Sequence, residues 1–277
     1  RSFVFYIAGI SIVTSHNIPY IFMHILVTND DGVHAPGLLA LTQAMRPFGD
    51  VTVLAPDRNW SGGGHVKTLH RPLRVRETAL ADGTPALMSD GAPSDCVALA
   101  LLGRVPKVDL VVSGINSHGN LGHDVTYSGT VTAAMEAVIA GVPGFAFSLA
   151  ATDKAIDCGG YGPAADYAGR IVGMMIERGL SPDLLLNVNV PCLPAEQIRG
   201  MRVTRQGLRI YRDLLDERVD PRGVPYYWIG GEYPTGVPDN GTDFGALEEG
   251  YVSITPLQLD LTNSVVMERL QEMTSDE

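Results

Sequence analysis

Short apolar runs alternate with longer amphipathic segments along most of the chain. Before residue 191 the runs of strand length cover residues 24–27, 51–55, 108–112, 145–149 and 184–190. Between them, apolar residues recur three and four positions apart and predict helices at residues 38–45, 97–102, 131–140 and 161–178. Residues 69–76 and 86–89 are expected to form short strands of an appended hairpin. Strands that alternate with helices favour an α/β fold with a mainly parallel sheet and helices on both faces.

The pattern changes beyond residue 199. Apolar runs at residues 201–204, 226–229 and 251–257 surround a charged segment at residues 212–223, and a short helix is predicted at residues 264–273. We therefore expect one domain, residues 23–277, made of an α/β core (23–198) and a strand-rich C-terminal extension (199–277). Projecting hairpins and terminal helices often form subunit contacts, so we expect an oligomer.

Residues 1–22 are interpreted as an upstream extension outside the fold. Their apolar run, residues 3–13, is far shorter than the ~20 residues that span a bilayer. No small-x-small cleavage site follows this run, and Met23 directly precedes the first predicted strand. A membrane tether is the less favoured alternative.

Two adjacent carboxylates, Asp30 and Asp31, follow the first predicted strand and lead into a helix. Neighbouring like charges are unfavourable unless they are exposed, accept hydrogen bonds from amides or are neutralised by a cation. The pair alone leaves two interpretations equally open. It can be a helix cap that shapes the turn, or part of a site for a hard metal ion with oxygen ligands.

The predicted topology decides between these interpretations. Right-handed crossovers bring the carboxyl ends of parallel strands to one edge of the sheet, where ligands bind in open α/β folds. That edge collects the two aspartates, the glycine-rich loop with Ser61, and the loop that begins at Asn116. Ser61 and Asn116 would each be an ordinary turn residue if taken alone. Beside two carboxylates they offer the oxygen ligands that suit Mg or Mn.

Other motifs point to weaker alternatives. Ser128, Gly129 and Thr130 begin the alanine-rich helix, where hydroxyls and amides can bind an anion, and a simple N-cap is equally open. Zinc ligation in the preceding loop is disfavoured, because no second cluster supports its candidate ligands His118, His123 and Asp124. The sequence contains no G-x-G-x-x-G after the first strand, no Walker motif and no G-x-S-x-G, which disfavours dinucleotide, P-loop and serine-hydrolase chemistry.

The amino-acid composition limits which binding partners and which cellular compartment are expected. The net charge of -11, from 20 Lys and Arg against 31 Asp and Glu, argues against binding of nucleic-acid polymers. The three cysteines, Cys96, Cys158 and Cys192, show no C-x-x-C spacing. A disulfide framework is therefore not expected, and a cytoplasmic location is favoured.

Several segments resemble the SurE survival proteins, a family of metal-dependent 5'/3'-nucleotidases. Residues 25–37 read ILVTNDDGVHAPG, residues 53–59 read VLAPDRN, and residues 111–116 read VVSGIN. Further matches are NLG at residues 120–122, YSGTV at 127–131, GTDF at 241–244 and GYVSITPL at 250–257. The resemblance covers residue 23 to about residue 262. Trp60 and His118 depart from the family pattern, which leaves the base preference open.

This resemblance implies a Rossmann-like, doubly wound core and a protruding C-terminal part that exchanges segments in homodimers or homotetramers. It implies that Asp30, Asp31, Ser61 and Asn116 hold one divalent metal per subunit, with the two aspartates as catalytic residues. Asn120 and the helix start at Ser128, Gly129 and Thr130 are then expected to bind the phosphoryl oxygens. The implied activity is hydrolysis of nucleoside 5'- and 3'-monophosphates, and in some members of short polyphosphate.

Two other functions stay open at this point. An aspartyl-phosphate phosphatase also carries an aspartate after its first strand, but D-x-D is expected there instead of adjacent carboxylates. A non-catalytic nucleotide sensor on the same scaffold would bind nucleotide without metal dependence and without releasing phosphate.

Overall fold

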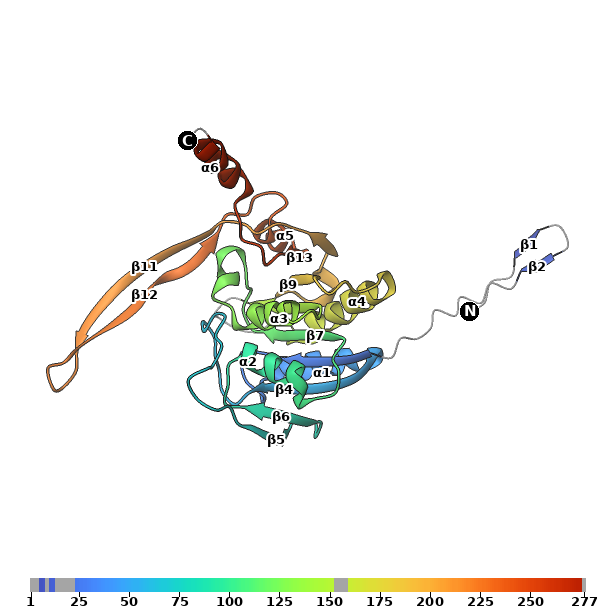
Figure 1. The fold of residues 1–277 in the computed structure, drawn as a ribbon, viewed down its shortest axis with the longest axis horizontal. Coiled ribbons are helices and arrows are strands. Elements are labelled where there is room, and N and C mark those ends of the chain that lie inside the picture. The colour runs from blue at the N-terminus through green and yellow to red at the C-terminus, as the bar shows by residue number, and fades with distance from the viewer. Residues whose placement is uncertain (1–4, 8–9, 13–22, 152–158, 276–277) are drawn as a thin grey trace.

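The computed structural model describes residues 5–7, 10–12, 23–151 and 159–275, and its centre is a nine-stranded sheet (Figure 1). The strand order is β10-β13-β9-β8-β7-β3-β4-β6-β5. The strands in the middle run parallel: β3 (Met23–Thr28), β4 (Gly49–Pro56), β7 (Leu110–Asn116), β8 (Gly144–Ala150) and β9 (Leu185–Pro191). The predicted α/β fold with a mainly parallel sheet is confirmed.

Helices cover both faces of this sheet. In β3, Ile25 and Val27 pack with α1 (Pro36–Met45) and α4 (Gly162–Arg178). Leu26 packs in a second cluster, with residues of α2 (Pro93–Leu99) and α3 (Gly129–Ile139). Successive residues of a strand point to opposite faces, so a strand covered on both sides is apolar at nearly every position. This explains the continuous apolar runs in the sequence.

Short strands complete both edges of the sheet. β5 (Val75–Ala79) and β6 (Pro85–Ser89) form the predicted hairpin, but β6 also pairs parallel to β4, so the hairpin belongs to the central sheet. At the other edge β13 (Val252–Leu257) runs antiparallel to β9, and β10 (Met201–Val203) pairs with β13. The segment expected as an extension thus contributes strands to the sheet, and the division at residue 199 stays a prediction.

A long hairpin projects from the body of the molecule (Figure 1). Its strands, β11 (Arg209–Val219) and β12 (Pro225–Gly236), form a separate two-stranded sheet. The charged segment at residues 212–223, expected to lie between strands, is in its first part a strand itself, within β11. Most of the charged residues lie in β11, which is held by pairing with β12 and not by burial.

The remaining elements are short. α5 (Asp243–Glu248) precedes β13, and α6 (Ser264–Ser275) is the predicted C-terminal helix. β1 (Phe5–Ile7) and β2 (Ile10–Ile12) pair with each other as another two-stranded sheet. The described helices include none with the length and apolar character needed to cross a membrane.

The cysteines differ from expectation. Cys96 is a buried free thiol, whereas Cys192 is disulfide-bonded, and Cys158 lies outside the described residues. The argument from cysteines for a reducing compartment therefore does not hold at Cys192.

Candidate active site

The turn after β3 presents the two adjacent aspartates at the carboxyl edge of the sheet. Asn29, which precedes them, is fully buried and holds the turn closed. Its side-chain amide donates to the Gly32 carbonyl at 3.0 Å, and its carbonyl oxygen accepts from the Gly32 N–H at 3.2 Å. Gly32 has a φ of 101°, a left-handed conformation that favours glycine. The hydrogen bonds between Asn29 and Gly32 thus hold the turn and fix the positions of Asp30 and Asp31.

Asp30 is buried and lies against the N-terminus of α3. The Thr130 hydroxyl donates to Asp30 Oδ1 at 2.5 Å, and the backbone of residues 129 and 130 also hydrogen-bonds to this carboxylate. Burial raises the pKa of Asp30, while these hydrogen bonds lower it. A Cβ on Gly129 would lie 2.7 Å from the Asp30 Cβ, so glycine is what lets the helix approach this closely.

Asp31 is only half-buried and faces a more open environment. Burial, followed by the neighbouring Asp30 charge, raises the pKa of Asp31 to about 6, and His118 acts in the opposite direction. The Asn59 amide donates to Asp31 Oδ1 at 3.2 Å. A pocket of about 490 Å³ opens beside Asp31 and is also lined by His34, Arg58 and Tyr161. Asp31 is therefore the carboxylate that a ligand from solvent can reach.

The glycine-rich loop with Ser61 is anchored on both sides of that residue. The Trp60 N–H donates to the Asp30 carbonyl at 2.7 Å, and the Gly64 N–H donates to the Tyr127 carbonyl at 2.9 Å. The Ser61 N–H itself donates to Asn59 Oδ1 at 2.7 Å. Ser61 is exposed at the top of this short arch. Asn59 consequently links Asp31 and Ser61, the two predicted ligands that come from different loops.

A buried carboxylate fixes the same loop further along. Glu136 of α3 receives hydrogen bonds from His65 at 3.0 Å and from Lys67 at 2.8 Å. The Thr132 hydroxyl donates to the Gly64 carbonyl at 3.1 Å. The loop therefore rests on the same helix whose first residues hold Asp30.

Asn116 ends β7, the strand next to β3. Its side-chain amide donates to the His118 carbonyl at 2.6 Å, which leaves the carboxamide oxygen as the atom suited to a cation. Asn120 is engaged internally. Its side-chain amide donates to the Ser148 hydroxyl at 2.8 Å, and its backbone N–H donates to Asn189 Oδ1 at 2.8 Å.

The predicted anion site at the start of α3 is largely occupied by protein groups. The Ser128 hydroxyl accepts the Val131 N–H at 3.0 Å as an N-cap, and Gly129 and Thr130 serve Asp30. Gly129 and Thr130 therefore lie against Asp30 and stabilise its carboxylate, whereas Ser128 caps the helix. Direct contact of Asn120, Ser128, Gly129 or Thr130 with a phosphoryl group stays a prediction.

The donor set suits a hard divalent cation. Two carboxylates, a hydroxyl and a carboxamide oxygen are the ligand types that Mg²⁺ and Mn²⁺ take in proteins. Both aspartates have a raised pKa, and no lysine or arginine is among the groups that lower it. A bound cation would supply the positive charge that this pair lacks. The described residues contain no group of three or more His, Cys, Asp or Glu that could hold a metal ion, and the predicted set has only two such residues, Asp30 and Asp31.

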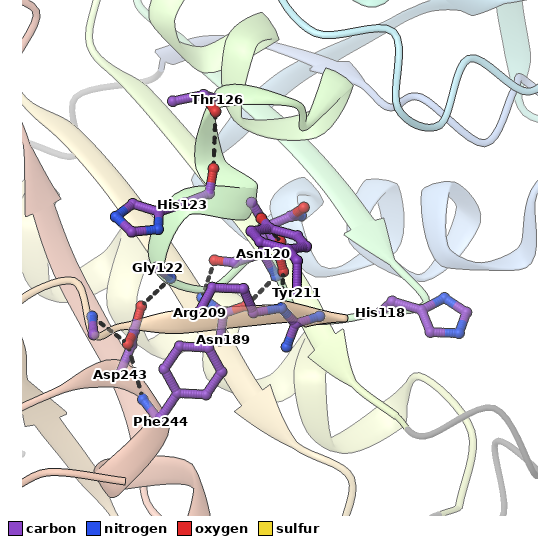
Figure 2. Close-up of polar contacts among 12 residues, drawn as sticks. His118, Asn120, Gly122, His123, Thr126, Asn189, Arg209, Tyr211, Asp243 and Phe244 are labelled. Atoms are coloured by element: carbon purple, nitrogen blue, oxygen red, sulfur yellow. Dashed lines mark hydrogen bonds and ion pairs between the residues drawn. The ribbon is translucent and has the colours of Figure 1, made fainter. Parts of the chain in front are cut away.

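The alternative zinc site does not form among the described residues. Asp124 is paired with Arg209 at 2.9 Å and accepts from the Tyr211 hydroxyl at 2.6 Å. Figure 2 shows His118 apart from His123, with the Arg209 side chain between the loop and the hairpin. The two histidines and Asp124 therefore do not converge.

Several residues of the site were not predicted. Asn59 bonds to Asp31 and Ser61, Tyr161 lines the pocket beside Asp31, and Glu136 fixes the loop that carries Ser61. The sequence context of Tyr161 and Glu136 does not separate them from ordinary loop and helix positions. Burial and the Asp31 charge raise the pKa of Tyr161, and the two residues line the same pocket. Only the position of Asn59 two residues before Ser61 offered a signal, since Asn side chains commonly bond two residues ahead in turns.

Comparison with known proteins gives a consistent result. Residues 25–213 match the model of the family described as Survival protein SurE. The chain is 56% identical over 249 residues to a protein of Herpetosiphon aurantiacus named 5'-nucleotidase SurE, covering 90% of this chain and 97% of that protein. A Geobacter sulfurreducens protein of the same name is 51% identical over 252 residues, covering 90% and 93%. The crystal structure of the SurE protein from Aquifex aeolicus is 41% identical, with a TM-score of 0.75 over 91% of this chain and 99% of that one.

Proposed function

The chain belongs to the Survival protein SurE family, and we propose that it is a 5'-nucleotidase that uses a divalent metal held by Asp30, Asp31, Ser61 and Asn116. The observation that supports this activity most strongly is sequence identity above 50%, over nine-tenths of the chain, to proteins named 5'-nucleotidase SurE. The substrates are nucleoside 5'-monophosphates. Neither a sensor nor an aspartyl-phosphate phosphatase is favoured by these relatives.

The residues of the site have separate tasks in this reaction. A divalent cation supplies Lewis acidity for the phosphoryl group and lowers the pKa of water bound to it. Asp30, fixed by α3, gives a ligand of defined position, and the hydrogen bonds from the helix start lower its pKa against the larger effect of burial. Asp31 lines the open pocket and would hold the same cation where a ligand from solvent can reach it.

The neutral ligands complete the set. Ser61 is placed by the anchors on Trp60 and Gly64, and Asn116 by its bond to the His118 carbonyl. Asn120 and the start of α3 are proposed to orient the phosphoryl oxygens once a metal binds. We further propose Mg or Mn, one ion per subunit, and 3'-monophosphates and short polyphosphate as additional substrates.

We propose that the functional unit is a homodimer or homotetramer. The hairpin exposes large apolar side chains, including Leu214 at 67%, Trp228 at 61% and Ile229 at 82%. In α6, Val265, Leu270 and Met273 are also exposed. Contiguous exposed apolar surface on projecting elements marks a protein–protein contact, and a second copy of the chain is the proposed partner. A cytoplasmic location likewise remains a proposal.

Asp31→Asn tests the proposed site. The amide keeps the shape of the side chain but removes the charge, so phosphate release from AMP should nearly vanish while the circular dichroism spectrum and melting cooperativity stay normal. Asp82→Asn, an exposed carboxylate held by Arg46 at 3.0 Å and remote from the catalytic edge, is the matched control and should keep full turnover. Near-normal activity of the Asp31 variant would overturn the assignment.

A further inference from the structure

We propose that the pocket between the loop of residues 117–122 and the base of the β11–β12 hairpin binds the nucleoside part of the substrate. The inference rests on the proposed function and assigns the part of that site which recognises the base. The pocket has a volume of about 470 Å³, and its walls include Gly119, Leu121, Ala150, Pro191, Arg209 and Phe244. Arg209 is the first residue of β11, and Phe244 lies in α5 with its ring near the Arg209 side chain (Figure 2).

The pocket lies on the same edge of the sheet as the aspartates. Asn116 ends β7 and pairs with Ser148, while Ala150 ends the neighbouring β8 and pairs with Pro191 of β9. Neighbouring strands are about 4.8 Å apart, so Ala150 and Pro191, the strand ends that line the pocket, lie on strands about 5 Å and about 10 Å from the strand that carries Asn116. A phosphate held at the aspartates would therefore place its ribose near residues 118–120 and its base in this pocket.

Buried hydrogen bonds fix the loop residues that form one wall of the pocket. Ser148 and Ala150 lie two residues apart in β8, so they share one face of the strand. Ser148 accepts from the Asn120 side chain at 2.8 Å, and the Asn187 and Asn189 side chains donate to the Asn120 carbonyl at 2.8 and 3.1 Å. A Cβ on Gly119 would lie 3.2 Å from that of Ala150, so the loop packs directly on the strand end. These contacts fix the part of the pocket wall that Gly119 and Ala150 form.

The chemistry of the walls favours a flat, uncharged ring. Arg209 is paired with Asp124 at 2.9 Å, and its Cζ lies 5.6 Å from the centre of the Phe244 ring. This cation is thus already neutralised and stacked against an aromatic ring. Glu248 also lines the pocket, and its carboxylate would repel a second phosphate group. Apolar walls with a few polar groups are typical of sites for small heteroaromatic ligands, so a nucleobase fits better than a polyphosphate chain.

Filling the pocket tests the assignment. Ala150→Leu adds side-chain volume at the pocket wall, and Thr235→Trp adds it from the exposed hairpin side. Ala140→Leu, at an exposed position that lines a groove near the end of α3, is the matched control. Each variant is assayed with AMP and with ribose 5-phosphate, which lacks a base. Binding of adenosine is measured separately by calorimetry in EDTA.

Both filling variants should lower kcat/KM for AMP about 10-fold or more, the scale of a lost fit in an apolar pocket. They should leave kcat/KM for ribose 5-phosphate within twofold, and adenosine binding should weaken in parallel. Equal losses for both esters in both variants, or unchanged AMP kinetics and adenosine binding, would overturn the proposal. If the wild-type protein releases phosphate from neither ester with any metal, the proposed function fails. Adenosine binding to the wild-type protein and to the variants is then the measurement that tests the pocket.

Discussion

Gly129→Ala should damage the site although alanine is the better helix former. Gly129 is the first residue of α3, and an added Cβ would lie 2.7 Å from the Asp30 Cβ and 3.0 Å from Asp30 Oδ2. Ordinary contacts of a Cβ are 3.4 Å or longer. Either the helix start or the aspartate must therefore move by roughly 0.7 Å, and both lie in a fully packed region in which overpacking costs about 1–3 kcal/mol.

The expected result is a selective loss of activity. A displacement of this size exceeds the about 0.5 Å tolerance of a catalytic group, so kcat/KM for AMP should fall about 10- to 100-fold. The metal dissociation constant, measured by calorimetry, should rise, because the carboxylate that moves is a proposed metal ligand. The circular dichroism spectrum should stay that of the wild-type protein, since the change is confined to one helix end.

Gly169→Ala in α4 provides the matched control. The nearest atom to its new Cβ is the Ala44 carbonyl oxygen at 3.7 Å, so the methyl group is accommodated. This variant should gain about 0.5–1 kcal/mol in the free energy of unfolding and keep full activity. If Gly129→Ala shows wild-type activity and metal affinity, Asp30 does not depend on close approach of the helix, and the reasoning is refuted.

Three other predictions follow from the structure. The pKa of Asp31 is raised to about 6 in the metal-free folded state, whereas the unfolded state releases this proton near pH 3.8. The free energy of unfolding should therefore fall as the pH rises from 4 to 6. In denaturant titrations, Asp31→Asn should flatten this slope. Glu136→Gln should weaken the contacts to His65 and Lys67 and lower the free energy of unfolding by only about 1 kcal/mol, because Lys67 is largely exposed. The variant should also bind metal more weakly, because Glu136 fixes the Ser61 loop. An unchanged metal dissociation constant in calorimetry would contradict this effect on the loop. Ile229→Glu in the hairpin should shift the assembly towards monomers in sedimentation velocity, and an unchanged distribution would exclude this face from the subunit contact.

The sequence predicts the central fold because burial leaves a direct trace in it. Strands covered on both faces, such as β3 and β8, must be apolar at nearly every position, and each shows as a continuous run. The β11–β12 hairpin leaves no such trace. Its residues are mostly exposed, so charged side chains are tolerated in β11 and pairing alone holds the strands. α5 was missed because six residues are too few to establish a period.

The site is predictable in outline for a topological reason. Parallel strands end on one edge, so residues following β3 and β7 must lie close together, and this places Asp30, Asp31 and Asn116 without coordinates. What the sequence cannot reveal is which hydrogen bonds each group makes. Gly129 and Thr130 looked like a site for an anion from solution, and in the fold they hold Asp30, because the packing of α3 against the turn depends on tertiary contacts far apart in the chain.

The most direct test of the central claim is phosphate release from a panel of nucleoside monophosphates. The purified protein would first be treated with EDTA, and Mg²⁺ or Mn²⁺ would then be added back. We expect release to stop with chelation and to return with metal, and Asp31→Asn to remain inactive in both conditions. Release that persists in EDTA would contradict a metal site at Asp30 and Asp31, and no release from any nucleotide with either metal would contradict the nucleotidase function.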